Sequence, residues 1–426
     1  MPKKRAIGIL IVVAVLVIGR PVGGQGLSAE EQRIVANVDA RLSEAYALLE
    51  RVVNIDSATQ NLDGVRRVGE VFRREFDRLG FATKWVDMPP DMKRAGHIVA
   101  ERTGSQGERL LILGHMDTVL QGEHFVTDGT TARGSGINDM KGGDVVLLFA
   151  LKTLQDAGAL DQRRVIVMLT GDEESPGEPL TISRRDLIEA AKRSDVALSF
   201  EATVRNTATV ARRGASFWTL EVTGSTGHSM GIFGPDRGSG AVFEAARILN
   251  AFHEQLRGER YLTFNPSVIV GGTHIDFAVD HGAATGKMNV VAQKVIVRGD
   301  LRFISEEQKE STRAKMRDIV RRNLPKTNAT ITFQDAYPAM SPTPANGQLL
   351  RQLAQISVEL GGAAVEPLDA SERGAGDISF AAPYTPGLDG LGIRGLGAHA
   401  PGESAELASF SLLIKRAAIL MYRLTR

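Results

Sequence analysis

The residues best suited to chemistry lie at the end of a long apolar run. Residues 110–114 are Leu-Leu-Ile-Leu-Gly, and His115, Met116 and Asp117 follow directly. The run predicts a buried strand, and if the strand continues that far, His115 and Asp117 share one face. A metal-binding histidine usually donates its second N–H to a carboxylate or carbonyl. The spacing therefore favours a metal ligand oriented by an aspartate, although a structural or surface pair has the same pattern.

Other acidic and histidine residues occupy similar positions, after a strand or in a Gly-rich turn: Asp139, Asp172, Glu173, Glu174, Glu201 and His399. Each has an ordinary explanation by itself, such as a helix N-cap for Asp139 or a solvated acidic turn for residues 172–174. Ligands of parallel α/β sheets gather at the carboxyl ends of the strands. The joint placement therefore predicts that these side chains converge in one cleft.

The predicted cleft has the composition of a zinc site. Zinc is bound by Cys, His and Asp or Glu side chains, and the chain has no cysteine. If one carboxylate bridges, two histidines and three carboxylates can hold two metals about 3.5–4 Å apart. The side chains of Glu173 and Glu174 diverge because they are neighbours, so one can bind metal while the other remains free to take a proton.

Strands alternate with helices in most of the chain, which predicts an α/β fold with a mostly parallel sheet flanked by helices. The pattern changes near residue 212. From there to about residue 335 the expected order is β-α-β-β-α-β, that of a ferredoxin-like α+β layer. We therefore expect catalytic segments at 27–212 and 336–426, and an inserted domain at 213–335.

The N-terminus predicts export. Lys3, Lys4 and Arg5 precede a short apolar run over residues 6–19, as in a secretory signal peptide, here residues 1–26. An uncleaved membrane anchor is the alternative. The expected location is the periplasm or the exterior, with membrane contact only if the leader remains. Without residues 1–26 there are 47 basic against 50 acidic residues, so the formal charge changes from +1 to −3. This balance does not indicate a nucleic-acid partner.

Several short stretches together resemble a known family, the di-zinc metallopeptidases that include bacterial glutamate carboxypeptidase, aminoacylases and succinyl-diaminopimelate desuccinylase. They follow the family's order and cover nearly all of the chain after the leader: residues 114–119 (Gly-His-Met-Asp-Thr-Val), 136–143, 172–174, 198–203, 374–377 and 397–399. The resemblance implies two zinc ions, or another divalent metal, and a homodimer. It implies that the inserted domain is a lid and dimerisation domain.

The resemblance also implies a role for each matching residue. One zinc would be held by His115, Asp139 and Glu201, and the other by Asp139, Glu174 and His399. Asp117 would orient His115, and Glu173 would be the general base. A cis peptide bond after the bridging aspartate, here Asp139–Met140, is a further family feature.

Three residues of the inserted domain match the family's substrate-binding positions. His228 would stabilise the oxyanion from the partner subunit, and Asn289 and Arg302 would hold a substrate carboxylate. A hairpin histidine and a solvated strand arginine are the alternatives. Residues 229–233 (Ser-Met-Gly-Ile-Phe) depart from the relatives after the lid histidine, so glutamate specificity is not carried over.

These expectations lead to a carboxypeptidase-like hydrolase of small peptides or N-acyl amino acids. Two alternatives remain. The first is an aminopeptidase or deacylase on the same scaffold, and the second is a metal-binding dimer without turnover. A spare base at Glu173 beside a metal ligand disfavours the second, because a protein that only binds metal has no use for it.

Overall fold

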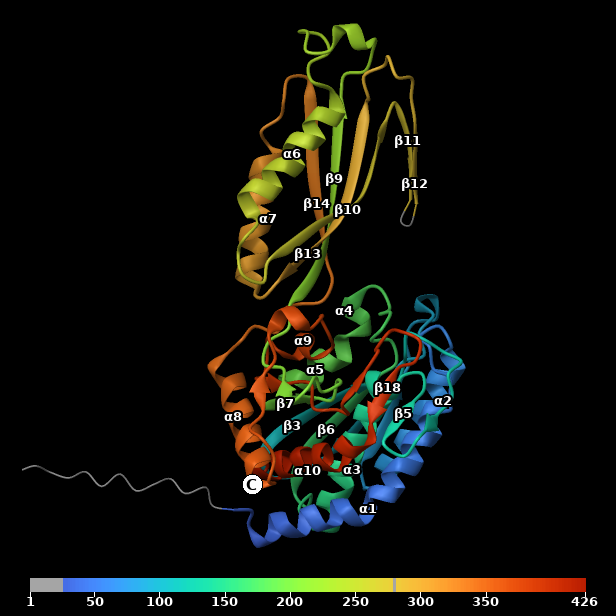
Figure 1. Cartoon of the computed structure of the whole chain (residues 1–426), viewed down its shortest axis with the longest axis vertical. Helices are drawn as coiled ribbons and strands as arrows, with labels where there is room; N and C mark the ends of the chain where they lie inside the picture. The colour runs from blue at the N-terminus through green and yellow to red at the C-terminus, as the bar shows by residue number, and fades with distance from the viewer. Residues whose placement is uncertain (1–25, 279–280) are drawn as a thin grey trace, which may run out of the picture.

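The computed structural model describes residues 26–278 and 281–426, which form a larger and a smaller layered body (Figure 1). The predicted leader, residues 1–26, lies outside the described residues except for Gly26. Among the residues described, no helix has both the length and the apolar character needed to cross a membrane.

A six-stranded sheet in the order β1-β2-β6-β3-β7-β16 organises the larger body. The strands β6 (Arg163–Thr170), β3 (Gln106–His115), β7 (Val196–Ser199) and β16 (Gly387–Leu388) run parallel. The strands β2 (His97–Arg102) and β1 (Ala82–Val86) extend the sheet in antiparallel pairing. The predicted α/β fold with a mostly parallel sheet is confirmed, and the carboxyl ends of β3, β6 and β7 meet at one edge.

The residues of these strands do not alternate between polar and apolar, because helices cover both faces of the sheet. In β3, Leu110 and Ile112 belong to one core, whereas Leu111 and Leu113 belong to another. The first core contains residues of α1 (Ala29–Val53), α2 (Leu62–Arg78), α3 (Gly142–Asp156), α8 (Pro344–Glu359) and α10 (Leu407–Leu424). The second contains residues of α5 (Arg185–Lys192) and α9 (Ile378–Ala381). Burial on both sides holds the strand ends in fixed positions.

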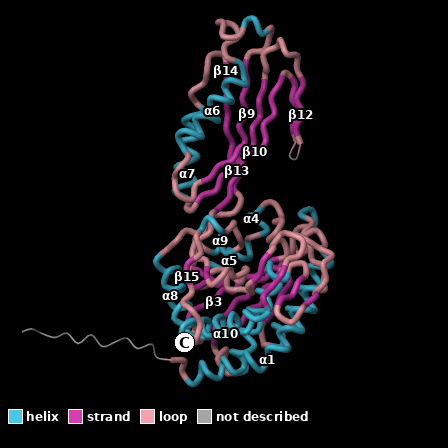
Figure 2. The backbone as a smooth tube through the Cα atoms, in the orientation of Figure 1, coloured by secondary structure: helices cyan, strands magenta, loops and turns pink. Residues whose placement is uncertain are grey.

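The smaller body, which we call the inserted domain, consists of the elements from β9 to β14. Its antiparallel sheet has the order β10-β13-β9-β14 (Figure 2), formed by β10 (Thr263–Gly272), β13 (Lys294–Phe303), β9 (Gly214–Gly224) and β14 (Thr327–Asp335). Helices α6 (Gly240–Leu256) and α7 (Glu306–Val320) cover one face, toward which Trp218, Leu220 and Val222 point. Phe217, on the opposite face, is exposed.

One hairpin of the inserted domain was not predicted. Strands β11 (His274–Phe277) and β12 (Gly282–Thr285) lie between β10 and β13 in the sequence and pair with each other as a separate two-stranded sheet. Strand β11 (His-Ile-Asp-Phe) alternates over four residues only, and β12 (Gly-Ala-Ala-Thr) has no large apolar residue. Most of their residues are exposed, so neither carries the longer apolar alternation that identifies a half-buried strand.

Two paired segments, residues 212–215 and 336–340, join the inserted domain to the larger body; we call them the connector. The Arg212 N–H donates to the Met340 carbonyl over 2.9 Å, and the Met340 N–H donates back over 3.0 Å. The Ala215 N–H donates to the Tyr337 carbonyl over 2.8 Å. The polypeptide thus leaves and re-enters the larger body through adjacent backbone segments.

A small sheet of short strands brings the C-terminal loop to the cleft. Its order is β17-β18-β5-β4, with β17 (Gly395–Leu396), β18 (Ser404–Glu406), β5 (Thr131–Arg133) and β4 (Val126–Thr127). The loop between β17 and β18 carries His399, and β5 leads into the turn that carries Asp139. Pairing of β18 with β5 therefore places these two residues near each other.

Candidate metal centre

The five predicted metal ligands lie together at the carboxyl edge of the central sheet. His115 ends β3, Glu174 follows β6, and Glu201 follows β7. Asp139 lies in the turn before α3, and His399 lies in the β17–β18 loop. Their ligand atoms form two groups, each with all atoms within 4.8 Å of one another: His115, Asp139 and Glu201, and Asp139, Glu174 and His399.

Asp139 is common to both groups and offers one oxygen to each histidine. Its Oδ1 lies 3.3 Å from His115 Nε2, and its Oδ2 lies 3.2 Å from His399 Nε2. Glu174 Oε2 lies 3.0 Å from the same His399 nitrogen. This is the geometry of a carboxylate that can bridge two cations. The peptide bond Asp139–Met140 is cis, as predicted.

The hydrogen bonding of His115 leaves one ring nitrogen available for a metal. Its Nδ1 lies 3.0 Å from the Asp117 backbone carbonyl, and a carbonyl can only accept, so Nδ1 carries the proton. The opposite nitrogen, Nε2, is buried without a hydrogen-bond partner. A buried ring nitrogen that has no hydrogen-bond donor to fill its lone pair, and that faces carboxylates, is suited to a metal ion.

The charges in the cleft also fit bound cations. Burial and the Asp139 carboxylate raise the pKa of Glu201 to about 7. Burial likewise raises the pKa of Glu174 above its usual range, and Glu174 Oε1 has no hydrogen-bond partner. Hydrogen bonds to Asp139 and Glu174 raise the pKa of His399 to about 10, so a proton is held between these carboxylates. Acidic groups crowded away from water favour a positive charge among them, and the donor set suits divalent metals.

Glu173 lies beside the cluster without belonging to the two groups that share Asp139. A ligand atom of Glu173 is within 4.8 Å of ligand atoms of His115 and Glu174. Burial, with the nearby Glu201 and Asp377 carboxylates, raises the pKa of Glu173 well above its usual range. The side chain is thus close enough to the cluster to exchange protons with a small molecule bound there.

The structure changes the expected part of Asp117. Strand β3 ends at His115, so the two residues do not share a strand face. The backbone carbonyl of Asp117 accepts the hydrogen bond from the His115 Nδ1–H. The Asp117 carboxylate is 3.6 Å from His115 Nδ1. It accepts hydrogen bonds from the N–H groups of Glu173 (3.0 Å) and Glu174 (3.1 Å) and from the Thr59 hydroxyl (2.6 Å). Asp117 therefore holds the turn that carries the base and a ligand.

Glu403 is a supporting residue that the sequence did not identify. It is 3 % exposed. Its Oε1 accepts from the N–H groups of Asn138 (2.7 Å) and Asp139 (2.8 Å), and its Oε2 accepts from Gly136 N–H over 2.8 Å. It lies four residues after His399, so it joins the two loops that approach the cleft from opposite ends of the chain. Only its place in a Pro-Gly-Glu turn after His399 could have drawn attention to it.

Two side chains of the connector, Arg212 and Tyr337, contact residues of the cleft. Arg212 Nη1 lies 3.6 Å from Glu201 Oε1 and 2.7 Å from Asp389. The Tyr337 hydroxyl donates to the Glu173 carbonyl over 3.0 Å and accepts from Arg184 over 3.2 Å. Fully buried Arg184 in turn pairs with Asp172 and Asp377 at 2.6 and 2.7 Å. The turn of Glu173 is therefore anchored to the connector.

The predicted substrate-binding residues are spread along the inserted domain. His228 and Asn289 lie together at its end far from the connector, with Asn289 Nδ2 3.5 Å from His228 Nε2. Arg302 lies at the connector end of β13, paired with Ala215. The eleven residues of β9 span roughly 35 Å between these ends. Within one chain, His228 and Asn289 therefore lie a strand's length from Arg302. Figure 1 shows that the end of β9 beyond which they lie points away from the larger body, which holds the metal cluster.

A sequence model for "Peptidase family M20/M25/M40" matches residues 111–423. The chain belongs to this family. It is therefore a metal-dependent hydrolase, and the resemblance seen in its short motifs is confirmed. Carboxypeptidase G2 from Pseudomonas sp. (strain RS-16) is 27% identical over 380 residues, which cover 86% of this chain and 85% of that protein.

Solved structures of low sequence identity have the same fold. Aminopeptidase PepT from Bacillus cereus is 16% identical, with a TM-score of 0.71 over 90% of this chain and 99% of that one. The YXEP protein of Bacillus subtilis, described as a dinuclear metal-binding peptidase of the M20 family, is 13% identical. Its TM-score is 0.63 over 91% of this chain and 99% of that one.

Proposed function

We propose that this protein is an exported di-zinc hydrolase that cleaves the amide bond of a short peptide or N-acyl amino acid, in the manner of a carboxypeptidase. The observation that carries the proposal is Asp139, shared between two histidines, with Glu173 free beside them. The dinuclear YXEP structure and the relative named carboxypeptidase G2 agree with two metals and with this bond. Export rests on the N-terminal sequence alone.

The metal ligands would divide as the geometry does. His115 and Glu201 would hold one zinc, Glu174 and His399 the other, and Asp139 both. When bound, the two metals supply Lewis acidity that polarises a carbonyl and lowers the pKa of water.

The chain's own residues would then move the protons. Glu173 would take a proton from the attacking water and pass it to the leaving nitrogen, so that an amine departs as the carbon–nitrogen bond breaks. A carboxyl group with a raised pKa suits both steps, because it can be charged for the first and neutral for the second. The Asp117 carboxylate and the Tyr337 hydroxyl hold the backbone of Glu173 in place meanwhile.

The oxyanion and the substrate carboxylate require residues from outside this cleft. His228 would donate to the oxyanion, and Asn289 would contact the substrate. Since one chain keeps both far from its own metals, we propose that they act in the cleft of the second subunit of a homodimer. Arg302 would hold the carboxylate of a substrate that is bound in the cleft of its own chain, because its guanidinium can pair with both carboxylate oxygens.

Replacing Glu173 with Gln tests the proposed mechanism. We expect kcat to fall by about 10²–10⁴-fold, measured by mass spectrometry on a library of dipeptides and N-acyl amino acids. Metal analysis should still find two zinc ions per chain, because Glu173 is not in either proposed ligand set. Glu189→Gln, on the exposed side of α5, is the matched control. Full activity of the Glu173 variant, or no zinc-dependent hydrolysis by the parent protein, would reject the mechanism.

A further inference from the structure

Three large apolar side chains surround His228 and Asn289 at the far end of the inserted domain. Met230 is 87 % exposed, Phe233 is 68 % exposed, and Met288 is fully exposed. A backbone hydrogen bond of 2.9 Å joins the loop after His228 to Asn289, so these side chains belong to one surface. Single exposed apolar residues are common, but a group of them marks a contact site. We call Met230, Phe233 and Met288 the apolar rim.

One residue of the apolar rim is tied to the proposed oxyanion donor by a hydrogen bond. The Met230 N–H donates to His228 Nδ1 over 3.2 Å. Because Nδ1 accepts, the Nε2 atom of the neutral ring carries the proton and can donate. Wherever the His228 imidazole meets an oxyanion, the Met230 backbone lies at the other edge of the same ring. Met230 is then close to the groups that flank the scissile carbonyl.

The backbone of Phe233 shows that its outward position is built into the loop. Its φ is 68°, in the left-handed region that bulky residues rarely adopt. Its N–H donates to the Gly238 carbonyl over 2.7 Å, and its ring lies 5.5 Å from the Phe243 ring between centroids. Residues held in such conformations are concentrated at ligand-binding sites. Met230 and Phe233 both belong to residues 229–233, the segment that departs from the relatives after the lid histidine.

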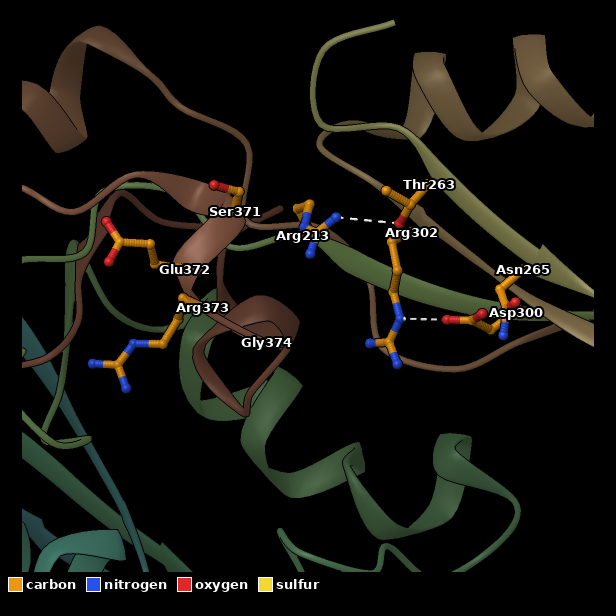
Figure 3. Close-up of a pocket in the computed structure, with 9 residues that line it drawn as sticks. All are labelled: Arg213, Thr263, Asn265, Asp300, Arg302, Ser371, Glu372, Arg373 and Gly374. Atoms are coloured by element: carbon orange, nitrogen blue, oxygen red, sulfur yellow. Dashed lines mark hydrogen bonds and ion pairs between the residues drawn. The ribbon is translucent and has the colours of Figure 1, made fainter. Parts of the chain in front are cut away.

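The connector end of the inserted domain has the opposite character. Arg302 lines a cavity of about 440 Å³ there, and the other lining side chains are charged or polar, among them Arg213 and Thr263 (Figure 3). Its guanidinium pairs with Asp300 at 2.9 Å. In the proposed homodimer, one cleft would receive Arg302 from its own chain and the apolar rim from the second subunit. Such a cleft suits a substrate with a carboxylate at one end and an apolar group at the other.

We propose that the apolar rim contacts the acyl group of a substrate in the cleft of the second subunit, and that the preferred substrate is an N-acyl amino acid with a large aliphatic or aromatic acyl group. This inference rests on the proposed function. The oxyanion that His228 would stabilise forms on the acyl carbon, so the acyl group, rather than the departing amino acid, lies beside Met230. Methionine side chains suit this contact, because they are flexible and adapt to apolar groups of different shape.

The length of the acyl chain tests the proposal. The zinc-loaded protein is given a series of N-acyl alanines whose acyl groups run from acetyl to octanoyl. We expect kcat/KM to rise about fourfold for each methylene that the apolar rim covers. In the double variant Met230→Ser/Met288→Ser, kcat/KM for the octanoyl substrate should fall about tenfold or more, while that for the acetyl substrate and the zinc content stay the same. Val358→Ser, at an exposed valine of α8, is the control and should keep the preference of the parent protein.

The outcomes separate this inference from the proposed function. Equal kcat/KM for all acyl lengths, an unchanged preference in the double variant, or hydrolysis of dipeptides alone overturns the inference and leaves the hydrolase function intact. A double variant that is monomeric in size-exclusion chromatography, and that loses activity equally on every substrate, also overturns it, because the rim is then a contact between subunits. If the parent protein shows no zinc-dependent hydrolysis of N-acyl alanines or of dipeptides, the proposed function fails together with the inference.

Discussion

The cleft of the larger body and the far end of the inserted domain differ in how their polar residues are held. In the cleft, His115, Asp117 and Glu403 are buried. Asp117 and Glu403 accept hydrogen bonds from another loop, and the His115 ring is held by the Asp117 carbonyl. At the far end, His228 and Asn289 are exposed, and the contact between their side chains is a 3.5 Å approach.

This difference indicates that the two regions have different functions. Groups that must hold metals are organised within one chain before any ligand arrives, which limits the reorganisation needed on binding. Groups proposed to meet the substrate remain at a distance, where a second subunit or a change in domain position can deliver them. Variants of both regions can test which residues act on the metals of their own chain and which act in a second subunit.

Among the variants that test this comparison, the largest effect is expected for His228→Ala, which removes the proposed oxyanion donor. We expect kcat to fall about 10²–10³-fold while zinc content stays at two per chain. Mixing this variant with Glu173→Gln gives heterodimers in which one cleft combines the intact Glu173 of one chain with the intact His228 of the other. Activity of the mixture should exceed that of both variants measured alone. If mixing restores nothing although heterodimers form, His228 does not act across subunits.

A smaller effect is expected for Glu403→Ala, which leaves three buried N–H groups of the Asp139 turn without their acceptor. Zinc affinity should fall by about 10–100-fold, measured by competition with a chelator. The free energy of unfolding should fall by about 3 kcal/mol. Glu403→Gln retains one carbonyl oxygen and should give intermediate values. Unchanged zinc affinity in the alanine variant would show that the turn holds Asp139 without this residue.

The smallest effect is expected for Tyr337→Phe, which removes the hydroxyl between the connector and the Glu173 carbonyl. One neutral hydrogen bond contributes about 1 kcal/mol, so kcat should fall about threefold to tenfold. KM and zinc content should stay the same, because the variant alters only the position of the base. Tyr384→Phe, at an exposed tyrosine, is the control. A loss of zinc, or a rise in KM without a fall in kcat, would contradict this function for Tyr337.

Much of the cleft could be predicted because each ligand follows a strong local signal. His115 ends an apolar run, and Asp139 lies in a Gly-rich turn before a helix; periodicity and glycine placement identify both. Glu403 and Tyr337 could not be found in this way. Their importance comes from hydrogen bonds to backbone groups more than 160 residues away, and no local pattern records such a partner.

The amino-acid sequence by itself determined the mostly parallel sheet, the α+β order of the inserted domain, and which side chains were candidates for binding metal. These follow from local preferences and from hydrophobic periodicity, which act over a few residues. Only the tertiary structure decided that Asp139 faces both histidines, that Asp117 supports the Glu173 turn, and that His228 lies far from the metals of its own chain. Such facts depend on how distant segments pack and on which buried polar groups find partners, and both are properties of the whole folded chain.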